Sequence, residues 1–295
     1  MTKVLILGST GLLGSTILKY FSIKSNFKCF GTIRKSSDKK KLKYINKVKL
    51  YKVDFDKPRS LRKVFSTIKP NLVINCIGVV KQVLNSNMNS EIIRVNSFLP
   101  HYLSELINEN NEIRFIHFST DCVFSGNRGN YLDNDFADAD DIYGKSKALG
   151  EVDSPNTLTL RCSMIGRELY NFTELFEWLK KNKNKKIEGY SKTFYSGITT
   201  VRMGIILNQI LKKNLNLSGI YNISSTPISK FDLLIKLSNA FNLNVEVKQN
   251  TNNKSNKVLI SEKFTEITGI YPPNWDDLIS EFKDDCEKYK SLYKN

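Results

Sequence analysis

Two short motifs place residues that could transfer a proton beside a residue that could hold a carbonyl group. Tyr143 and Lys147 are four residues apart in the run Tyr-Gly-Lys-Ser-Lys, so a helix would present both on one face. A lysine cation near a tyrosine favours the phenolate and lowers the phenol's pKa from its usual value of about 10. Thr120, in the run Ser-Thr-Asp that ends an apolar segment, offers a hydroxyl to a carbonyl oxygen. Together these residues predict proton donation to a ketone that accepts a hydride.

A glycine-rich turn near the start of the chain predicts a site for a diphosphate. It reads Gly8-Ser9-Thr10-Gly11-Leu12-Leu13-Gly14 and follows directly on the apolar run Val4–Leu7. Gly8 permits a tight bend, Gly11 lets the backbone approach phosphates, and Gly14 lets the next helix pack on the strand. The positive end of that helix would face the anion. The three-and-three glycine spacing differs from the commoner two-and-three fingerprint, so a turn without a ligand is the alternative interpretation.

The end of the second predicted strand indicates which dinucleotide is preferred. Proteins that bind NAD usually place Asp or Glu there to accept hydrogen bonds from the adenosine ribose. This chain has Arg34 and Lys35 instead, followed by Ser36. Two cations suit a 2′-phosphate, and Arg34 can hold it with its planar guanidinium. We therefore expect NADP(H). The alternative is NAD(H), with both cations as ordinary solvated loop charges.

Strand-like and helical runs alternate along the first half of the chain, which predicts an α/β fold. The expected strands are Val4–Leu7, Lys28–Ile33, Lys49–Val53, Leu72–Cys76, Phe115–Ser119 and Thr157–Leu160. The expected helices are Leu12–Phe21, Ser37–Asn46, Ser60–Ile68, Glu91–Asn108 and Tyr143–Val152. Short apolar strands joined through helices indicate a Rossmann-like doubly wound parallel sheet, buried on both faces. Its ligands would bind beyond the carboxyl ends of the strands, where each motif above falls.

A smaller C-terminal α/β substrate lobe is expected after the first domain. Residues 1–165 would form the dinucleotide-binding domain and residues 166–295 mainly the substrate lobe, with some later segments returning to the first domain. The expected elements are helices at Phe172–Lys181, Val201–Lys212 and Lys230–Phe241 and strands at Ile220–Ile223 and Val245–Val247. The polar stretch Gln249–Lys257 is predicted to be an exposed loop, and Glu281–Asn295 a charged helix or frayed tail.

The composition argues against several classes of protein. The 295 residues are 40% hydrophobic and 25% charged, as in globular proteins, and no apolar run approaches the length that crosses a bilayer. We expect a cytoplasmic protein, because Val4–Leu7 reads as a strand rather than as part of a signal peptide. The net charge of +16 comes from scattered lysines without a nucleic-acid motif. We therefore expect an attraction for anionic nucleotides, and neither a nucleic-acid nor a membrane partner.

Cysteine and histidine usage predicts neither a disulfide framework nor a metal site. Five cysteines are present, and no CxxC or Cys/His ligand spacing occurs. Cys29, Cys76 and Cys162 lie in apolar runs and are expected to be buried reduced thiols. His101 and His117 are the only histidines, and His117 lies inside an apolar run, where a hydrogen-bonded core residue is expected.

Four motifs together resemble the extended short-chain dehydrogenase/reductases that act on nucleotide sugars. They are Gly8–Gly14, Asn75–Gly78, Ser119–Gly126 and Tyr143–Lys147. Within that superfamily the chain is most similar to the dTDP-4-dehydrorhamnose reductases, which belong to polysaccharide biosynthesis. The resemblance implies an oxidoreductase that uses NADPH to reduce the 4-keto group of a nucleotide-linked 4-keto-6-deoxy sugar. It also implies a homodimer, and it is specific over roughly the first 165 residues.

The resemblance assigns roles to single residues. The catalytic residues would be Thr120, Asp121, Tyr143 and Lys147. Besides the glycine turn, Arg34 and Lys35, the cofactor would contact Asp54 and Phe55 near the adenine, then Cys76, Ile77, Gly78, Asn96, Tyr143 and Lys147. The substrate-side candidates are Cys122, Val123, Cys162, Ser163 and, for the sugar diphosphate, Lys192.

One position bears on which reaction of this superfamily is expected. The 4,6-dehydratases carry Thr-Asp-Glu, and Cys122 stands here in place of the Glu, so sugar dehydration is not expected. A cysteine there resembles the acid/base cysteine of the GDP-fucose synthases, which epimerise before they reduce; a space-filling role is the alternative. A bifunctional epimerase-reductase therefore stays open. So do a simple 4-epimerase and a non-catalytic cofactor-binding regulatory subunit, as in methionine adenosyltransferase.

Two further features allow both a functional and a structural interpretation. The acidic stretch Asp133–Asp141 precedes Tyr143 and could close over the substrate or be a solvated surface segment. Trp178 and Tyr195 could stack on a base or sugar, or pack within the second lobe.

Overall fold

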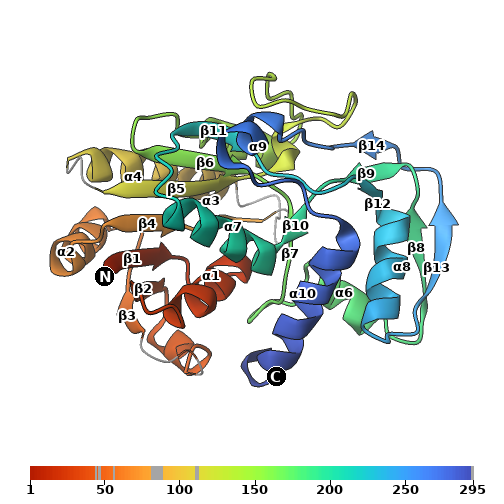
Figure 1. Ribbon diagram of the computed structural model, residues 1–295, viewed down its shortest axis with the longest axis horizontal. Coiled ribbons are helices and arrows are strands. Elements are labelled where there is room, and N and C mark those ends of the chain that lie inside the picture. The colour runs from red at the N-terminus through yellow and green to blue at the C-terminus, as the bar shows by residue number, and fades with distance from the viewer. Residues whose placement is uncertain (44, 46–47, 56, 81–88, 110–112, 294–295) are drawn as a thin grey trace.

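The structure, a computed structural model, describes residues 1–43, 45, 48–55, 57–80, 89–109 and 113–293. Figure 1 shows a large lobe around a central sheet beside a smaller lobe that holds α8, β8 and β13. Among the described helices, none combines the length and the apolar character that crossing a bilayer requires.

A parallel sheet forms the centre of the large lobe. Its seven strands, all from the described residues, lie in the order β3–β2–β1–β4–β5–β6–β11. Their bounds are β1 Thr2–Leu7, β2 Phe27–Ile33, β3 Lys49–Lys52, β4 Leu72–Asn75, β5 Arg114–Ser119, β6 Thr157–Arg161 and β11 Gly219–Asn222. The direction of winding reverses between β1 and β4, where Leu7 pairs with Asn75. The predicted doubly wound parallel sheet is confirmed, and ligands of such sheets bind at this reversal.

Helices cover both faces of the sheet because successive strand side chains point to opposite sides. Val4 and Ile6 pack into a core with α1 (Leu12–Ser22) and α7 (Thr200–Lys212). Leu5 and Leu7 pack into a second core with α2 (Pro58–Ile68) and α4 (Leu99–Asn108). Strands buried on both faces read as continuous apolar runs, which explains why they were readable from the sequence.

The smaller lobe is built from short strands and helices. The strands are β7 Met164–Ile165, β8 Lys186–Tyr190, β9 Thr193–Tyr195, β10 Ile198–Thr199, β12 Ile228–Ser229, β13 Glu246–Asn250 and β14 Ser255–Asn256. Its helices are α6 Leu175–Lys181 and α8 Lys230–Ala240, whereas α9 Glu262–Thr268 packs on β11 of the large lobe. After this lobe has begun, the chain returns to the large lobe, because β11 pairs with β6 and α7 packs on α1.

Of two expectations for the end of the chain, one is wrong in part, and for the other the helix alternative is confirmed. The stretch Gln249–Lys257 is not simply a loop, since β13 runs to Asn250 and β14 follows at Ser255–Asn256. The C-terminal helix α10 starts at Trp275 and runs to Lys288, and Phe282 and Cys286 are buried in the main core. A frayed tail is therefore excluded for the described part, which ends in a 3₁₀ turn at Lys290–Tyr293.

The expected helix Glu91–Asn108 is interrupted. It consists of α3 (Asn89–Ile92), a π-helical turn at Ile93–Phe98 and α4, which has a proline in its first turn. A single π turn inside a helix often marks a functional site, and Asn96 lies in it. The stretch Ser37–Asn46 contains a 3₁₀ turn, Ser36–Lys40, and its residues 44 and 46 lie outside the described residues.

Candidate active site

The glycine turn joins β1 to α1 and is held in a tight, specific shape. Gly8 has a φ of 75°, and its backbone N–H donates a hydrogen bond to the Thr32 hydroxyl at 3.0 Å. A Cβ on Gly14 would lie 2.1 Å from the carbonyl oxygen of Gly8, so helix and turn touch there. No side chain among the described residues caps α1, whose first turn therefore faces outward with its positive end toward the groove.

A groove with a volume of about 1070 Å³ opens over this turn. Gly8, Thr10, Gly11 and Leu12 line one part of it. A second part carries five cations, which are Arg34, Lys35, Lys40, Lys41 and Lys43. Acidic residues also line it, and one of them, Glu91, lies 3.6 Å from the Arg34 guanidinium. The cationic wall and the open helix end fit an elongated anionic ligand such as a dinucleotide.

A smaller pocket of about 300 Å³ continues from the groove. The two cavities share Gly11, Leu12, Glu174 and residues 76–80. The pocket brings together six of the residues predicted for catalysis or for the substrate, which are Thr120, Cys122, Tyr143, Lys147, Cys162 and Ser163. They come from the carboxyl ends of β5 and β6 and from helix α5 (Ile142–Leu149). Only the fold brings these segments together.

Thr120 and Tyr143 are linked by a hydrogen bond between their hydroxyl groups. The Thr120 hydroxyl also donates to Asp121 Oδ1 at 3.1 Å and accepts from the Cys122 backbone N–H at 3.2 Å. Burial raises the pKa of Tyr143, and the nearby Cys122 thiol adds to the rise. The expectation that this pKa is lowered is therefore wrong for the protein alone, because desolvation of the phenolate is the largest effect on it.

Lys147 is buried and donates a hydrogen bond from Nζ to the Phe118 carbonyl oxygen at 2.7 Å. Burial lowers the pKa of Lys147 to about 8, against the opposing charge of Glu151. Helix α5 places the lysine one turn beyond Tyr143, as their spacing predicts. Asp141 caps the start of the helix, and its carboxylate accepts the Gly144 backbone N–H at 2.8 Å.

Gly144 is a site residue that the sequence reasoning missed. A Cβ there would lie 2.2 Å from the Cys122 carbonyl oxygen, so any side chain would push α5 away from the Thr120–Cys122 segment. The glycine between Tyr143 and Lys147 therefore sets the distance between the phenol and Thr120. The signal was present as the second letter of the Tyr-Gly-Lys-Ser-Lys run.

Several predicted cofactor residues support the walls rather than line them. The Asn96 side chain accepts the Val79 N–H at 2.8 Å and donates to the Val79 carbonyl and the Ser146 hydroxyl. The buried Ser9 hydroxyl donates to the Ile6 carbonyl. Both residues thus hold the shape of segments that do line the groove.

Four other predicted residues do not line either cavity. Asp54 forms an ion pair with Lys57 at 3.5 Å, whereas the adjacent Phe55 does line the groove. Val123 is fully buried in a small core with Phe124 and Tyr131. Lys192 is exposed in the turn between β8 and β9, and Asp121 is buried behind Thr120. Burial in an apolar cluster removes Val123 from contact with a substrate.

Two charged residues of the second lobe reach the site without having been predicted. Glu174 lines both cavities, and burial together with the nearby Glu168 raises its pKa to about 7. Lys230 begins α8 and lies 3.7 Å above the Tyr195 ring. Burial lowers the Lys230 pKa, and Asp121, Cys122 and Glu174 oppose that shift. No local sequence pattern predicts either residue, because the distance of each from the pocket depends on how the two lobes pack together.

The acidic stretch before Tyr143 is an ordered set of turns. Asp138 accepts the Ser125 backbone N–H at 2.8 Å and its hydroxyl at 2.6 Å. Asp135 accepts the Leu132 N–H and pairs with Arg128, and Asp133 accepts the Asn222 N–H. The carboxylates therefore fix the turns of a surface segment, in which Asn134, Phe136 and Asp138 are exposed. This agrees with the expected surface segment, and closure over a substrate stays a prediction.

Of the two aromatic candidates, Tyr195 is buried and packs against Trp275, whereas Trp178 is half-exposed on α6. The histidine expectation holds in part. His117 is buried, and its Nδ1 lies 3.1 Å from the Asn75 amide nitrogen, while among the described groups its Nε2 has no hydrogen-bond partner. None of the five cysteines forms a disulfide, and the described residues contain no group of three or more acidic, Cys or His side chains that could hold a metal ion.

Comparison with known proteins decides the relationship. A family model described as the RmlD substrate binding domain matches residues 1–287. The chain belongs to this family. A dTDP-4-dehydrorhamnose reductase from Aggregatibacter actinomycetemcomitans is 27% identical over 252 residues, which span 80% of this chain and 78% of that protein. Methionine adenosyltransferase 2 subunit beta from Danio rerio is 24% identical over 258 residues, or 82% of this chain and 74% of that protein.

A solved structure of similar fold is that of a dTDP-4-dehydrorhamnose reductase from Bacillus anthracis in complex with NADP. It is 19% identical, has a TM-score of 0.78 and covers 97% of this chain and 99% of its own. At that identity the likeness shows the fold. The predicted extended short-chain dehydrogenase/reductase architecture and the resemblance to dTDP-4-dehydrorhamnose reductases are thereby confirmed.

Proposed function

We propose that this protein is an NADPH-dependent reductase of the 4-keto group of a nucleotide-linked 4-keto-6-deoxy sugar. One observation carries the proposal: Thr120, Tyr143 and Lys147 meet in a small pocket that opens into the cation-lined groove. The names of the relatives from Aggregatibacter and Bacillus support the substrate class.

The residues of the pocket have separate tasks in this reaction. A reduced nicotinamide dinucleotide in the groove would supply the hydride. Because its pKa is raised, Tyr143 stays protonated and donates its phenolic proton to the oxygen of the former ketone. Thr120, already hydrogen-bonded to that phenol, holds the same oxygen. Lys147, as an ammonium below about pH 8, stabilises the tyrosinate that remains and can donate to ribose hydroxyls.

The preference for NADP(H) rests on the cationic wall. Arg34 and Lys35 follow β2 at the position where an acidic residue would accept ribose hydroxyls, and three more lysines line the same part of the groove. The Arg34 side chain is 74% exposed and thus free to turn toward a 2′-phosphate, although Glu91 competes for it.

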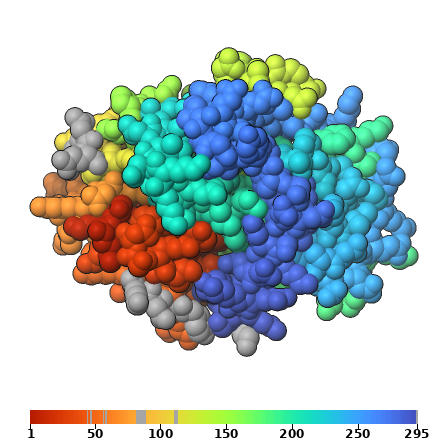
Figure 2. All heavy atoms as spheres, viewed as in Figure 1, coloured from red at the N-terminus to blue at the C-terminus, as the bar shows by residue number. Residues whose placement is uncertain are grey.

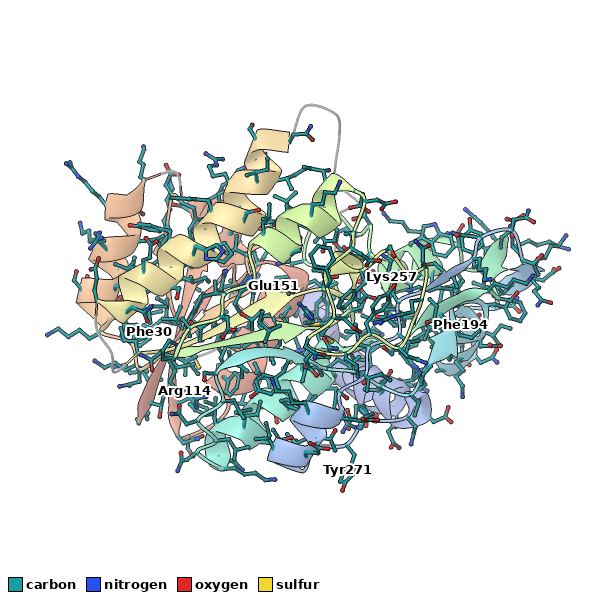
Figure 3. All side chains as sticks on the ribbon, turned by 90° about the horizontal axis from the view of Figure 1, so that it is seen from above. Phe30, Arg114, Glu151, Phe194, Lys257 and Tyr271 are labelled. Atoms are coloured by element: carbon teal, nitrogen blue, oxygen red, sulfur yellow. The ribbon has the colours of Figure 1, made fainter. Side chains whose placement is uncertain are left out.

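A panel of nucleotide 4-keto-6-deoxy sugars, generated by dehydratases in the assay, tests the proposal. We expect NADPH oxidation that depends on the ketone, with products identified by NMR. Tyr143→Phe should lower turnover by about 10²- to 10⁴-fold and leave NADPH binding intact. Tyr271→Phe is the matched control, since this residue is 77% exposed and projects from the edge of the molecule (Figure 3). Normal turnover by Tyr143→Phe would contradict the mechanism.

Two results of the same panel would favour other functions. NADPH binding without turnover on any sugar would favour a regulatory subunit, the role suggested by the name of the Danio relative. Epimerisation is favoured by the position of Cys122 on the pocket wall beside Tyr143. If its thiol moves protons, the wild-type protein should exchange substrate hydrogens next to the ketone with D₂O, and Cys122→Ser should not.

A further inference from the structure

The last described turn of the chain, Lys290–Tyr293, lies at the dinucleotide groove. Ser291 and Leu292 line it together with the glycine turn and Arg34. Figures 1 and 2 show the dark-blue C-terminal end beside the red and orange segment that contains α1. A groove formed mainly by the first part of the chain thus has one wall from its opposite end.

A buried lysine of α1 anchors this turn. Lys19 is 2% exposed, and its Nζ lies 2.5 Å from the Asp285 carboxylate on α10. The same nitrogen donates to the Tyr293 hydroxyl at 3.4 Å and lies 4.3 Å from the centre of the Tyr289 ring. A buried ammonium is costly unless it is paired and hydrogen-bonded, so these contacts favour one position of the C-terminal segment.

The second lobe anchors the same turn from the other side. The Arg167 guanidinium lies 4.5 Å from the centre of the Tyr293 ring and pairs with Glu177 on α6. Tyr293 is therefore held between α1 and the loop that follows β7. Glu168 and Tyr170 of that loop line the groove next to Ser291 and Leu292.

We propose that the turn Lys290–Tyr293 is a wall of the dinucleotide site, where Ser291 and Leu292 contact the adenosine half of the ligand. Lys19 is a positioning residue that holds the turn in place. The assignment to the adenosine half follows because both residues line the cation-lined groove and, among the described residues, neither belongs to the lining of the reaction pocket. The inference rests on the proposed function, in that the groove takes a 2′-phosphorylated dinucleotide.

Binding measurements with NADPH and with 2′,5′-ADP, which represents its adenosine half, test this wall. Leu292→Ala removes apolar contact area and should weaken both ligands by the same factor, about five- to tenfold. Lys19→Met should weaken both at least as much, and Lys19→Arg, which keeps a cation for Asp285, should restore binding to within about twofold. The control is Lys236→Met. This change breaks a 2.6 Å ion pair between Lys236 on α8 and Asp276, which lies on α10 like Asp285 but away from the groove.

The outcomes separate this inference from the proposed function. If the wild-type protein binds both ligands and Leu292→Ala binds them equally well, the turn is not part of the site and the inference is wrong. If Leu292→Ala weakens the binding of NADPH but not that of 2′,5′-ADP, the inference is also wrong, because Leu292 would then contact the nicotinamide half of the ligand. If the wild-type protein binds neither ligand, the proposed dinucleotide site itself is wrong.

Discussion

The two connected cavities of this protein differ in how they use charge. The groove is large, and its cations Arg34, Lys35 and Lys40 stand on exposed loops where water screens them. The pocket is less than a third of that volume, and in it Lys147 is buried while Tyr143 and Glu174 are partly buried. Burial shifts the pKa of both Tyr143 and Lys147 in the pocket. The groove instead has several long, exposed cationic side chains that can extend toward a ligand.

This difference in charge environment suits the groove to ligand binding and the pocket to the reaction. An exposed cation contributes little individually, so the grip on an anionic ligand is spread over several side chains. A buried donor in a small pocket interacts strongly because little solvent competes with it. We therefore expect large losses from single changes in the pocket and graded losses from changes in the groove.

After Tyr143→Phe, the largest effect is expected at Lys147. Lys147→Met should lower kcat/KM by about 10²- to 10³-fold, because the tyrosinate loses its neighbouring cation. In the wild-type protein the pKa near 8 means that the cation is present below pH 8 and lost above it, so kcat/KM should fall above about pH 8. The measurement is a pH profile with saturating NADPH. Lys145→Met, on the exposed side of the same helix, should keep the wild-type profile; a flat wild-type profile to pH 10 would contradict the assignment.

Two substitutions in the glycine turn should affect different properties, one the stability of the fold and the other the binding of NADPH. Gly14→Ala forces a methyl group to within 2.1 Å of the Gly8 carbonyl and should cost about 3 kcal/mol of unfolding free energy. Gly11→Ala has 3.4 Å of room and a φ of −72°, so stability should change by less than about 1 kcal/mol. Its methyl group would stand in the groove, and NADPH binding should weaken about tenfold. Urea unfolding and NADPH titration of both variants measure these effects. If the two variants are equally stable, the tight contact between Gly14 and Gly8 does not limit the side chain at position 14.

Glu174, on the boundary between the two cavities, should make stability depend on pH. Its pKa of about 7 exceeds the ordinary 4.5, so the folded protein keeps a proton that the unfolded chain releases. Stability should then fall as pH rises from about 4.5 to 7, because the unfolded chain binds fewer protons in that window. Glu174→Gln cannot ionise and should gain about 2 kcal/mol over the wild type between pH 5 and pH 8. Urea unfolding at both pH values measures this, with the exposed Glu188→Gln as a control that should show no such gain.

The smallest effect is expected in the groove. Arg34→Ala should reduce the preference for NADPH over NADH about tenfold, through loss of charge-assisted hydrogen bonds to the 2′-phosphate. The ratio of kcat/KM for the two nucleotides is the measurement. Arg62→Ala removes another exposed arginine, which pairs with Glu109 and lines neither cavity, so the ratio should stay constant. If Arg34→Ala keeps the preference for NADPH over NADH, the groove lysines and not Arg34 select the nucleotide.

Much of the sheet and the site was predictable because its signals are local. Strands buried on both faces appear as short apolar runs, and the expected strands of the first domain differ from the observed ones by a residue or two at each end. The tight contact at Gly14 and the shared helix face of Tyr143 and Lys147 also follow from spacing alone.

The errors fall where local patterns do not specify a structure. Val123 is next to Cys122 in sequence, yet one side chain packs into a separate core and the other reaches the pocket. The polar stretch Gln249–Lys257 forms strands because β8 and β9 lie beside it, and strand pairing to a distant partner leaves no mark on a short polar sequence.

Spacing and composition along the chain were enough to specify a doubly wound sheet, a tight glycine turn before a helix and a tyrosine–lysine pair, since each depends on neighbours within a few residues. The pKa shifts of Tyr143, Lys147 and Glu174, the reach of Lys230 and the approach of Leu292 to the groove emerged with packing. Desolvation and long-range contact exist only once distant segments exclude water from one another, and no window of sequence contains both partners.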